Sequence, residues 1–302
     1  MTEVIGRLKA LDNCSVIENA SLSNYTGFRT GGPTVVVEPL NTCAFVHAVR
    51  ILSEEKAKFR VLGNGSNTVA LDEGSDGIVV RTQKALVNLY IDADANEITA
   101  GAGVLLSQLC NFALKNSLTG LEFAYGIPGT VGGAVYMNAG AYDGEISFVL
   151  KSAKVLDIGT GEVSVMKAAE LQLSYRHSII HENRNLVVLE AVFSLAPGDA
   201  TEIREKMDDL KGRRIAKQPL DYPSCGSTFK RPVGNYAGKL IEECGLKGYT
   251  VGGACVSEKH AGFVINKGGA TTADIFGVID HVQKTVLEET GYYLDCEVEV
   301  LK

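Results

Sequence analysis

The sequence predicts an α+β fold: a small βαβ unit, then a mixed or antiparallel α+β unit, then a C-terminal α+β domain. Three observations support this. Strand, helix and strand patterns follow one another near the N-terminus; from Gly77 short strands alternate with turn residues; and after Pro-Gly-Asp at 197–199 strands and helices alternate. Because 302 residues exceed the usual size of one core, we place the domains at 1–75, 76–197 and 198–302.

The first unit begins with an apolar run at residues 34–39, which predicts a strand. A cap at Asn41 or Thr42 then opens a helix, and a second strand follows at 60–62. The apolar residues of this helix share one face: Phe45, Val46, Val49 and Leu52. This βαβ unit ends in a glycine loop.

The second unit contains one long helix over residues 105–115, with Leu105, Leu109 and Phe112 in register. Its predicted strands are short and lie at 78–80, 89–91, 97–99, 154–157, 162–165 and 186–189. The strands at 154–157 and 162–165 flank Gly-Thr-Gly, which predicts a hairpin.

A helix that carries Ile203, Met207 and Leu210 and ends at residues 213–214 connects to the last domain. The elements predicted there are a strand at 227–229, a helix at 237–244 stopped by Gly245, a strand at 262–265, a helix at 272–290 stopped by Gly291, and a strand at 297–300. The apolar stripe of the final helix indicates core packing.

Composition excludes several classes of protein. The formal net charge of −7, without a clustered basic face, argues against nucleic-acid binding. Seven cysteines without a C-x-x-C pair predict free thiols, and neither a zinc site nor a disulfide framework. The N-terminus lacks an apolar signal region and no run of 18 apolar residues occurs, so we expect a cytoplasmic protein that does not insert into membranes.

Two glycine-rich segments indicate a ligand site. Residues 120–142 contain six glycines and a single charge, Glu122, and residues 63–67 (GNGSN) follow a predicted strand. Glycine lets backbone amides approach phosphate oxygens, so two such loops suggest a dinucleotide pyrophosphate. The Rossmann fingerprint is absent, because no third glycine follows Gly65 and no clean amphipathic helix is expected after the second loop.

The motifs at 24–32, 63–67, 126–133, 138–142, 174–178, 226–230 and 294–298 together resemble those of the bacterial UDP-N-acetylenolpyruvoylglucosamine reductases, a family of vanillyl-alcohol-oxidase-like flavoproteins. The resemblance runs in order from about residue 20 to the C-terminus. Residues 175–186 are too short for the extra tyrosine-bearing loop of one branch, so the chain resembles the branch without it.

The resemblance implies a two-subdomain flavin-binding region followed by a substrate-binding domain, non-covalent FAD and NADPH as hydride donor. We expect a monomer. The implied reaction reduces the enolpyruvyl ether of a UDP-sugar in peptidoglycan precursor synthesis. The cofactor residues it implies are Arg29, Gly63, Asn64, Gly65, Ser66, Asn67, Gly126, Pro128, Gly129, Thr130, Gly132, Gly133, Asn138, Ala139 and Gly140.

Three residues match the catalytic positions of the family: Arg176, Ser227 and Glu297. A guanidinium can bind a carboxylate at two points, which suits Arg176 to the enolpyruvyl group. Glu297 would be its partner, with a raised pKa that allows proton donation; an outward-facing position on a strand is the alternative. Ser227 would donate the proton to carbon, although a Gly-Ser pair alone usually marks only a turn.

Arg214 and Lys217 match positions that reach the substrate or the dinucleotide, and a cationic helix end explains them equally well. Tyr175, Lys239 and Asn266 complete the expected substrate residues. Two other readings stay open here: a flavin oxidase acting on a small alcohol or hydroxy acid, and a non-enzymatic nucleotide-binding module. None of the five histidines lies in a glycine loop, which argues against the tethered flavin of such oxidases.

Overall fold

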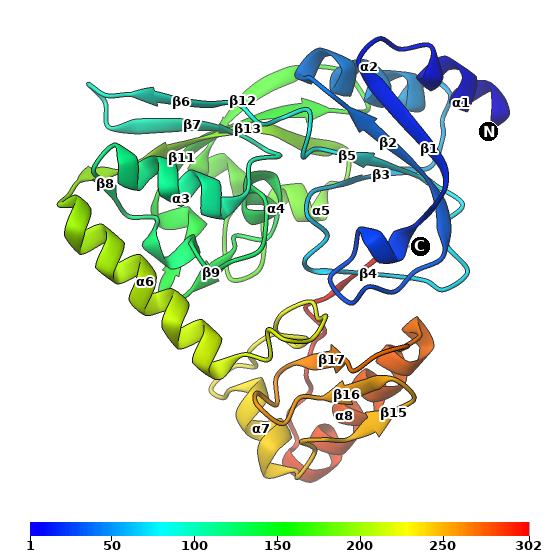
Figure 1. Ribbon diagram of the computed structural model, residues 1–302, viewed down its shortest axis with the longest axis vertical. Helices are drawn as coiled ribbons and strands as arrows, with labels where there is room; N and C mark the ends of the chain where they lie inside the picture. The colour runs from blue at the N-terminus through cyan, green and yellow to red at the C-terminus, as the bar shows by residue number, and fades with distance from the viewer. Residues whose placement is uncertain (302) are drawn as a thin grey trace. The chain divides into compact units, whose positions relative to one another are not determined.

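The computed structural model describes residues 1–301 (Figure 1), and they form two compact units. Unit 1 comprises Met1–Glu18, Val35–Asn64 and Gly77–Arg213; unit 2 comprises Asn19–Thr34, Gly65–Asp76 and the chain from Arg214 onward. The predicted domains at 1–75, 76–197 and 198–302 are consecutive, whereas both units are discontinuous. The predicted domain boundaries at 1–75, 76–197 and 198–302 stay a prediction.

Unit 1 starts with α1 (Thr2–Lys9) and contains the predicted βαβ unit: β2 (Pro33–Pro39), α2 (Thr42–Glu54) and β3 (Phe59–Leu62). The four-stranded sheet has the order β1 (Cys14–Ser21), β2, β5 (Ile78–Arg81), β3, and both β2 and β3 pair parallel with β5. Helix α2 begins where predicted, because Asn41 Oδ1 accepts a hydrogen bond from the Ala44 amide at 2.9 Å.

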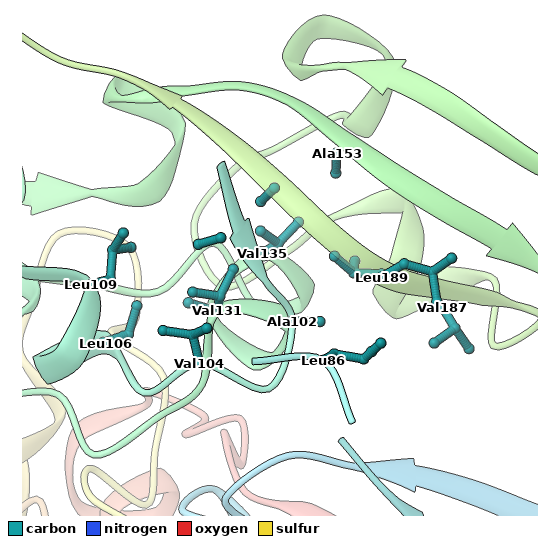
Figure 2. Packing of buried hydrophobic residues seen from close by; sticks show 14 of the residues in the cluster. Leu86, Ala102, Val104, Leu106, Leu109, Val131, Val135, Ala153, Val187 and Leu189 are labelled. Atoms are coloured by element: carbon teal, nitrogen blue, oxygen red, sulfur yellow. The ribbon is translucent and has the colours of Figure 1, made fainter. Parts of the chain in front are cut away.

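The second sheet of unit 1 is antiparallel, in the order β12 (Val163–Lys167), β11 (Leu150–Asp157), β13 (Leu186–Ser194), β7 (Glu97–Gly101), β6 (Leu89–Asp92). The predicted hairpin is confirmed: Val155 pairs with Ser164. Helix α4 (Val131–Tyr136) packs on β13 and β7, and α3 (Leu106–Lys115) adds its apolar face to the same core. Figure 2 shows Val131 and Val135 of α4 within this core, together with Leu189 of β13.

Short elements join these sheets. They are η1 (Leu22–Asn24), β8 (Leu118–Thr119), η2 (Glu122–Ala124), β9 (Gly140–Ala141), β10 (Gly144–Glu145), η3 (Ile146–Phe148), η4 (Ala168–Leu171), α5 (Ile179–Glu182) and β14 (Ala196–Pro197). Helix α6 (Ala200–Lys217) continues three residues past its predicted end. It buries Ile203 and Met207.

In unit 2, β15 (Thr250–Val251), β16 (Ala254–Val256) and β17 (Val264–Asn266) form an antiparallel sheet, with α7 (Ala237–Glu243) and α8 (Thr272–Thr290) alongside. Helix α8 has the predicted bounds. Its N-cap Thr271 forms a capping box with Asp274, and Gly291 ends it at a φ of 76°. The predicted strand at 227–229 is wrong: only an isolated bridge between Phe229 and Cys296 forms there.

Two early segments belong to unit 2 because long-range contacts hold them there. Strand β4 (Thr68–Ala70) pairs parallel with β18 (Glu299–Leu301), which begins two residues later than predicted. The Asp72 carboxylate accepts hydrogen bonds from the Thr272 amide at 2.7 and 3.0 Å, where an anion favours the start of α8. Phe28 and Val69 are buried in the same core as α8. Within residues 1–301, no helix is long and apolar enough to span a membrane.

Candidate active site

Residues 63–64 of the first glycine loop lie next to the second glycine loop in unit 1. Asn64 Nδ2 donates a hydrogen bond to the Pro128 carbonyl oxygen at 2.7 Å, and Asn64 Oδ1 accepts one from Gln83 Nε2 at 2.8 Å. A Cβ atom on Gly63 would lie 2.3 Å from Thr130 Oγ1, so only glycine permits this approach. The structure thus brings together four of the predicted cofactor residues.

The second loop leads directly into α4, where the sequence predicted no clean helix. Thr130 is the N-cap, and its Oγ1 accepts a hydrogen bond from the Gly133 amide at 3.4 Å. Gly132 packs against Ala102: its amide donates to the Ala102 carbonyl oxygen at 2.8 Å, and a Cβ would lie 2.9 Å from Ala102 Cβ. The cap and this packing stabilise a six-residue helix whose glycines lower its intrinsic propensity.

The loops retain amide groups that suit an anionic ligand. The amides of Val131 and Gly132 donate within the protein. Across the chain up to residue 301, by contrast, no acceptor pairs with the amide of Gly129 in unit 1, or with those of Gly65 and Ser66 in unit 2. Donors of this kind, on residues with little or no side chain, fit phosphate oxygens such as those of FAD.

Arg176 lies at the tip of a tight turn in unit 1. Ser174 and His177 close this turn through two backbone hydrogen bonds of 3.1 and 3.2 Å. Arg176 adopts a φ of 54°, in the left-handed region that non-glycine residues rarely occupy, and such strain clusters at functional sites. Its guanidinium donates to the Gly140 carbonyl oxygen at 3.2 Å and lies 5.0 Å from the centre of the exposed Tyr175 ring.

Asn138 connects this turn to the second glycine segment. Its buried side chain donates through Nδ2 to the Ser174 carbonyl oxygen at 3.0 Å and to Glu145 Oε1 at 3.1 Å. Its Oδ1 accepts from the Ser147 amide at 2.9 Å. The predicted cofactor residues Asn138 and Gly140 therefore hold the turn that carries Arg176.

In unit 2, Ser227 and Glu297 lie on two segments that Thr228 joins. The Glu297 amide donates to the Thr228 carbonyl oxygen at 2.8 Å, and Thr228 is fully buried. Ser227 is exposed and follows Gly226, which has a φ of 76°. Two predicted catalytic residues therefore flank one backbone hydrogen bond.

Glu297 is also fixed by the first glycine loop. Asn67 Nδ2 donates to the Glu297 carbonyl oxygen at 2.9 Å, and the Asn67 carbonyl oxygen accepts from the Glu299 amide at 2.9 Å. The carboxylate side chain itself is half-buried. The structure thus connects a predicted cofactor residue to a predicted catalytic residue within unit 2.

The predicted substrate residues of unit 2 differ in how they are held. Arg214 and Lys217 lie in the last turn of α6, and Lys239 lies on α7, where it pairs with Glu243 at 3.7 Å. The Asn266 side chain donates to the Phe28 carbonyl oxygen at 2.9 Å and accepts from two amides of the 268–270 turn. Exposed Arg29, at a φ of 56°, lies in the same unit. Their ligand roles stay predictions.

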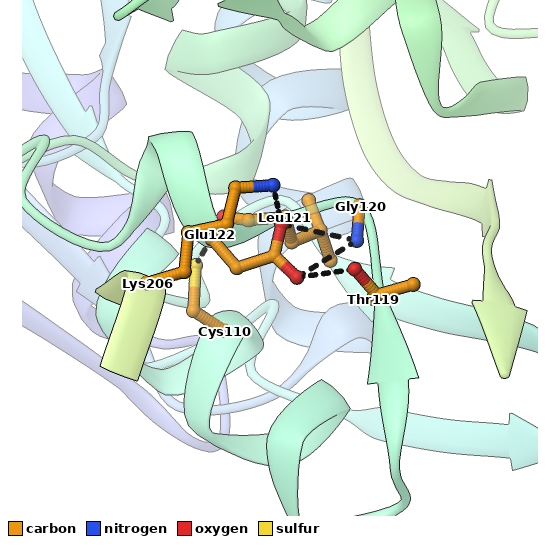
Figure 3. A network of polar contacts seen from close by, with 6 residues as sticks. All are labelled: Cys110, Thr119, Gly120, Leu121, Glu122 and Lys206. Carbon is orange, nitrogen blue, oxygen red and sulfur yellow. Dashed lines mark hydrogen bonds and ion pairs between the residues drawn. The ribbon is translucent and has the colours of Figure 1, made fainter. Parts of the chain in front are cut away.

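Sequence reasoning assigned no role to Glu122, whose carboxylate is buried beside the second glycine loop (Figure 3). It accepts hydrogen bonds from Thr119 Oγ1 at 2.6 Å and from the Gly120 amide at 3.1 and 3.2 Å, and Lys206 Nζ of α6 lies 3.3 Å away. The signal was available, because Glu122 is the only charge in residues 120–142. Burial and this carboxylate raise the pKa of the neighbouring Cys110 thiol.

The surroundings of Glu122 favour its ionised form. Burial alone would raise the pKa of its carboxyl, but hydrogen bonds from Thr119 and from backbone amides, together with Lys206, outweigh burial and lower that pKa below 4.5. A carboxyl with a lowered pKa in the folded state stabilises the protein above its unfolded pKa, and this contribution disappears as the pH falls through the folded pKa.

We therefore expect Glu122→Gln to lower the free energy of unfolding at pH 7 by about 1–3 kcal/mol, since a buried charged network loses one partner. The difference from the parent should shrink as the pH falls through the lowered folded pKa, where the parent carboxyl also becomes protonated. Urea unfolding at several pH values measures it. Exposed Glu162→Gln is the control; a Glu122→Gln deficit that persists unchanged at acidic pH would contradict this account.

Comparison with known protein families defines the class. Residues 33–167 match the family model of the FAD binding domain, and residues 218–301 match that of the C-terminal domain of UDP-N-acetylenolpyruvoylglucosamine reductase. The chain is an FAD-dependent oxidoreductase. This excludes the non-enzymatic module.

Relatives specify the family. UDP-N-acetylenolpyruvoylglucosamine reductase of Clostridium novyi (strain NT) is 50% identical over 292 residues, 96% of this chain and 94% of that protein. The enzyme of the same name from Pediococcus pentosaceus (strain ATCC 25745 / CCUG 21536 / LMG 10740 / 183-1w) is 47% identical over 97% of this chain and 96% of its own length. The crystal structure of the reductase (MurB) from Thermus caldophilus superposes with a TM-score of 0.79 at 34% identity, covering 96% of this chain and 100% of that one. The chain belongs to the UDP-N-acetylenolpyruvoylglucosamine reductase family, which confirms the resemblance seen in the motifs.

Proposed function

We propose that this protein reduces the enolpyruvyl ether of UDP-N-acetylglucosamine enolpyruvate to UDP-N-acetylmuramate, with NADPH as hydride donor, in peptidoglycan precursor synthesis. Bound FAD would supply the redox chemistry by accepting a hydride from NADPH and passing it to the substrate. The observation that carries the proposal is the hydrogen-bonded frame of Thr228 in a chain that matches reductases over nearly its full length. That frame holds the two segments with Ser227 and Glu297.

The three catalytic roles divide by chemistry. Arg176 would bind the enolpyruvyl carboxylate, because a guanidinium stays charged and offers two parallel donors. Glu297 would stabilise the charge that develops on that carboxylate by donating a proton or a hydrogen bond. Ser227 would deliver a proton to the carbon next to the ether oxygen. Its exposed position, after a glycine in the left-handed region, supports a role toward a ligand.

The glycine loops would hold FAD without a covalent bond. The unpaired amide of Gly129 supports a pyrophosphate cradle, and so does the close approach of Gly63 to Thr130, which leaves no room for a side chain at residue 63. Asn138 and Gly140 would serve the cofactor indirectly, by fixing the turn of Arg176. A cytoplasmic location and a monomeric state complete the proposal; size-exclusion chromatography with light scattering tests the latter.

The overall reaction is tested with the purified protein under anaerobic conditions. We expect a yellow protein whose flavin absorbance bleaches on adding NADPH and returns on adding the enolpyruvyl UDP-sugar. Flavin that an alcohol substrate bleaches and oxygen restores, while the enolpyruvyl sugar nucleotide does not reoxidise it, would favour the oxidase reading instead.

Arg176→Lys should separate charge from geometry. Lysine keeps the positive charge but cannot bind a carboxylate at two points, so we expect a large loss in substrate-driven reoxidation of the flavin and near-normal reduction by NADPH. Glu297→Gln should behave in the same way. Stopped-flow absorbance of each half-reaction measures both variants.

Lys151→Arg, on an exposed strand position away from the turn, is the control for a change of cation in unit 1. Equal slowing of the two half-reactions in Arg176→Lys or Glu297→Gln would place these side chains in structural support of the flavin.

A further inference from the structure

His260 lies in the loop that connects β16 to β17, and its ring accepts a backbone hydrogen bond. The Gly262 amide donates to His260 Nδ1 at 3.1 Å, and the ring makes an edge contact with Phe263 at 4.9 Å between centres. An acceptor nitrogen carries no proton, so the ring is neutral and its proton is on Nε2. Ser257 Oγ accepts the His260 amide at 3.3 Å, which fixes the loop from its other side.

The same peptide segment holds Thr228. The Thr228 amide donates to the Gly262 carbonyl oxygen at 2.9 Å, and Thr228 Oγ1 accepts from the Val264 amide at 3.0 Å. Since the Thr228 carbonyl oxygen accepts from the Glu297 amide, Thr228 is bound on both sides. Gly262 is therefore the link between the His260 ring and the residue that follows Ser227.

Burial of the His260 ring opposes its protonation. Burial is the largest effect and lowers the pKa of the ring; the backbone carbonyl of His260 raises that pKa, Lys247 and Lys217 lower it, and Glu242 raises it, with a net lowering. Lys247 and Glu242 pair with each other at 2.7 Å. The pKa of the ring thus lies below the ordinary value of a histidine, which favours the neutral form that the hydrogen bond from Gly262 requires.

We propose that His260 is a positioning residue that holds Ser227 in place through Gly262 and Thr228, and that protonation of its ring releases this hold. The inference rests on the proposed role of Ser227 as proton donor. A protonated Nδ1 is a donor facing the Gly262 amide, another donor, so the hydrogen bond that fixes residue 262 is lost.

The consequence is an acidic decline in one half-reaction only. Loss of a single hydrogen bond corresponds to a rate change of about threefold to tenfold. We expect that decline in substrate-driven flavin reoxidation as the pH falls through the lowered pKa of His260, and no matching decline in flavin reduction by NADPH.

Two substitutions of His260 distinguish the effect of protonating its ring from the effect of losing its hydrogen bond to Gly262. In His260→Asn, the side-chain oxygen can accept from the amide two residues on, as in an Asx turn, but does not titrate. His260→Asn should keep most of the parent reoxidation rate at pH 7.5 and lose the acidic decline. His260→Ala should be slow at every pH. His281→Asn, which removes a histidine stacked on Tyr249 in the same unit, is the control and should keep the decline.

Spectroscopy of the FAD-loaded protein gives a second measurement. In a nitrogen-15 NMR titration, the His260 ring and the Gly262 amide should shift with one common midpoint, on the acid side of an ordinary histidine pKa. Three results would overturn the inference. They are an acidic decline that persists in His260→Asn, a reoxidation rate of His260→Ala equal to that of the parent, and a Gly262 amide signal that does not shift when the ring titrates. If Ser227→Ala reoxidises as fast as the parent, the proposed role of Ser227 fails instead.

Discussion

Replacing Ser227 by alanine is expected to slow substrate-driven flavin reoxidation by about 10²–10⁴-fold, the usual contribution of a general acid. FAD content and reduction by NADPH should stay close to normal, because Ser227 is exposed. Stopped-flow absorbance of the flavin in each half-reaction measures the effect.

Ser227→Cys should recover part of the lost rate, since a thiol can donate a proton from a similar position. Ser224→Ala, three residues earlier in the same segment, is the matched control and should react like the parent. Unchanged reoxidation in Ser227→Ala would mean that water or another group protonates the substrate, and that the serine only completes the turn after Gly226.

Gly65→Ala should abolish stable flavin binding. Gly65 has a φ of 65°, and a Cβ would lie 1.9 Å from the Tyr25 carbonyl oxygen, a backbone atom that cannot rotate away. The loop must therefore move, and with it the unpaired amides of Gly65 and Ser66. We expect FAD affinity to fall at least about tenfold, or about 1.4 kcal/mol, measured by fluorescence during dialysis against FAD.

Gly161→Ala separates the clash from the backbone strain. Gly161 has a φ of 75° in an exposed turn, and no atom lies near a Cβ added there. The Gly161→Ala variant therefore has only the left-handed backbone strain of about 1 kcal/mol, without a steric clash. It should keep its flavin. Full FAD retention by Gly65→Ala would show that this loop does not determine cofactor binding.

The sequence predicted elements well where local signals suffice. Helix α8 has its predicted bounds because Thr271, Asp274 and Gly291 define its ends, and α2 follows the Asn41 cap. Helix α4 was missed because its glycines hide a helix that Thr130 and tertiary packing stabilise. The strand expected at 227–229 failed because its partners are loop segments around residues 262 and 296.

The sequence motifs predicted the side chains of the candidate site that would contact a ligand. They did not predict the residues that hold those side chains in place. Arg176 was predicted, but its left-handed turn and the buried Asn138 contact were not. Thr228 and Gly262 are joined through a backbone amide and a backbone carbonyl, and any residue carries those groups. The sequence pattern therefore does not predict such long-range hydrogen bonds, which are seen only in the folded structure.

The interleaved order of the two units has a consequence for synthesis on the ribosome. Residues 19–34 and 65–76 emerge early from the ribosome, but β4 pairs with β18. The Ala70 carbonyl oxygen accepts a hydrogen bond from the hydroxyl of Thr272, which lies 202 positions later in the chain. Closing so long a loop is entropically costly and slow. Unit 2 can therefore be completed only after β18 has left the ribosome, and a fragment that begins at residue 218 would lack the strand and the Asp72 cap that complete it.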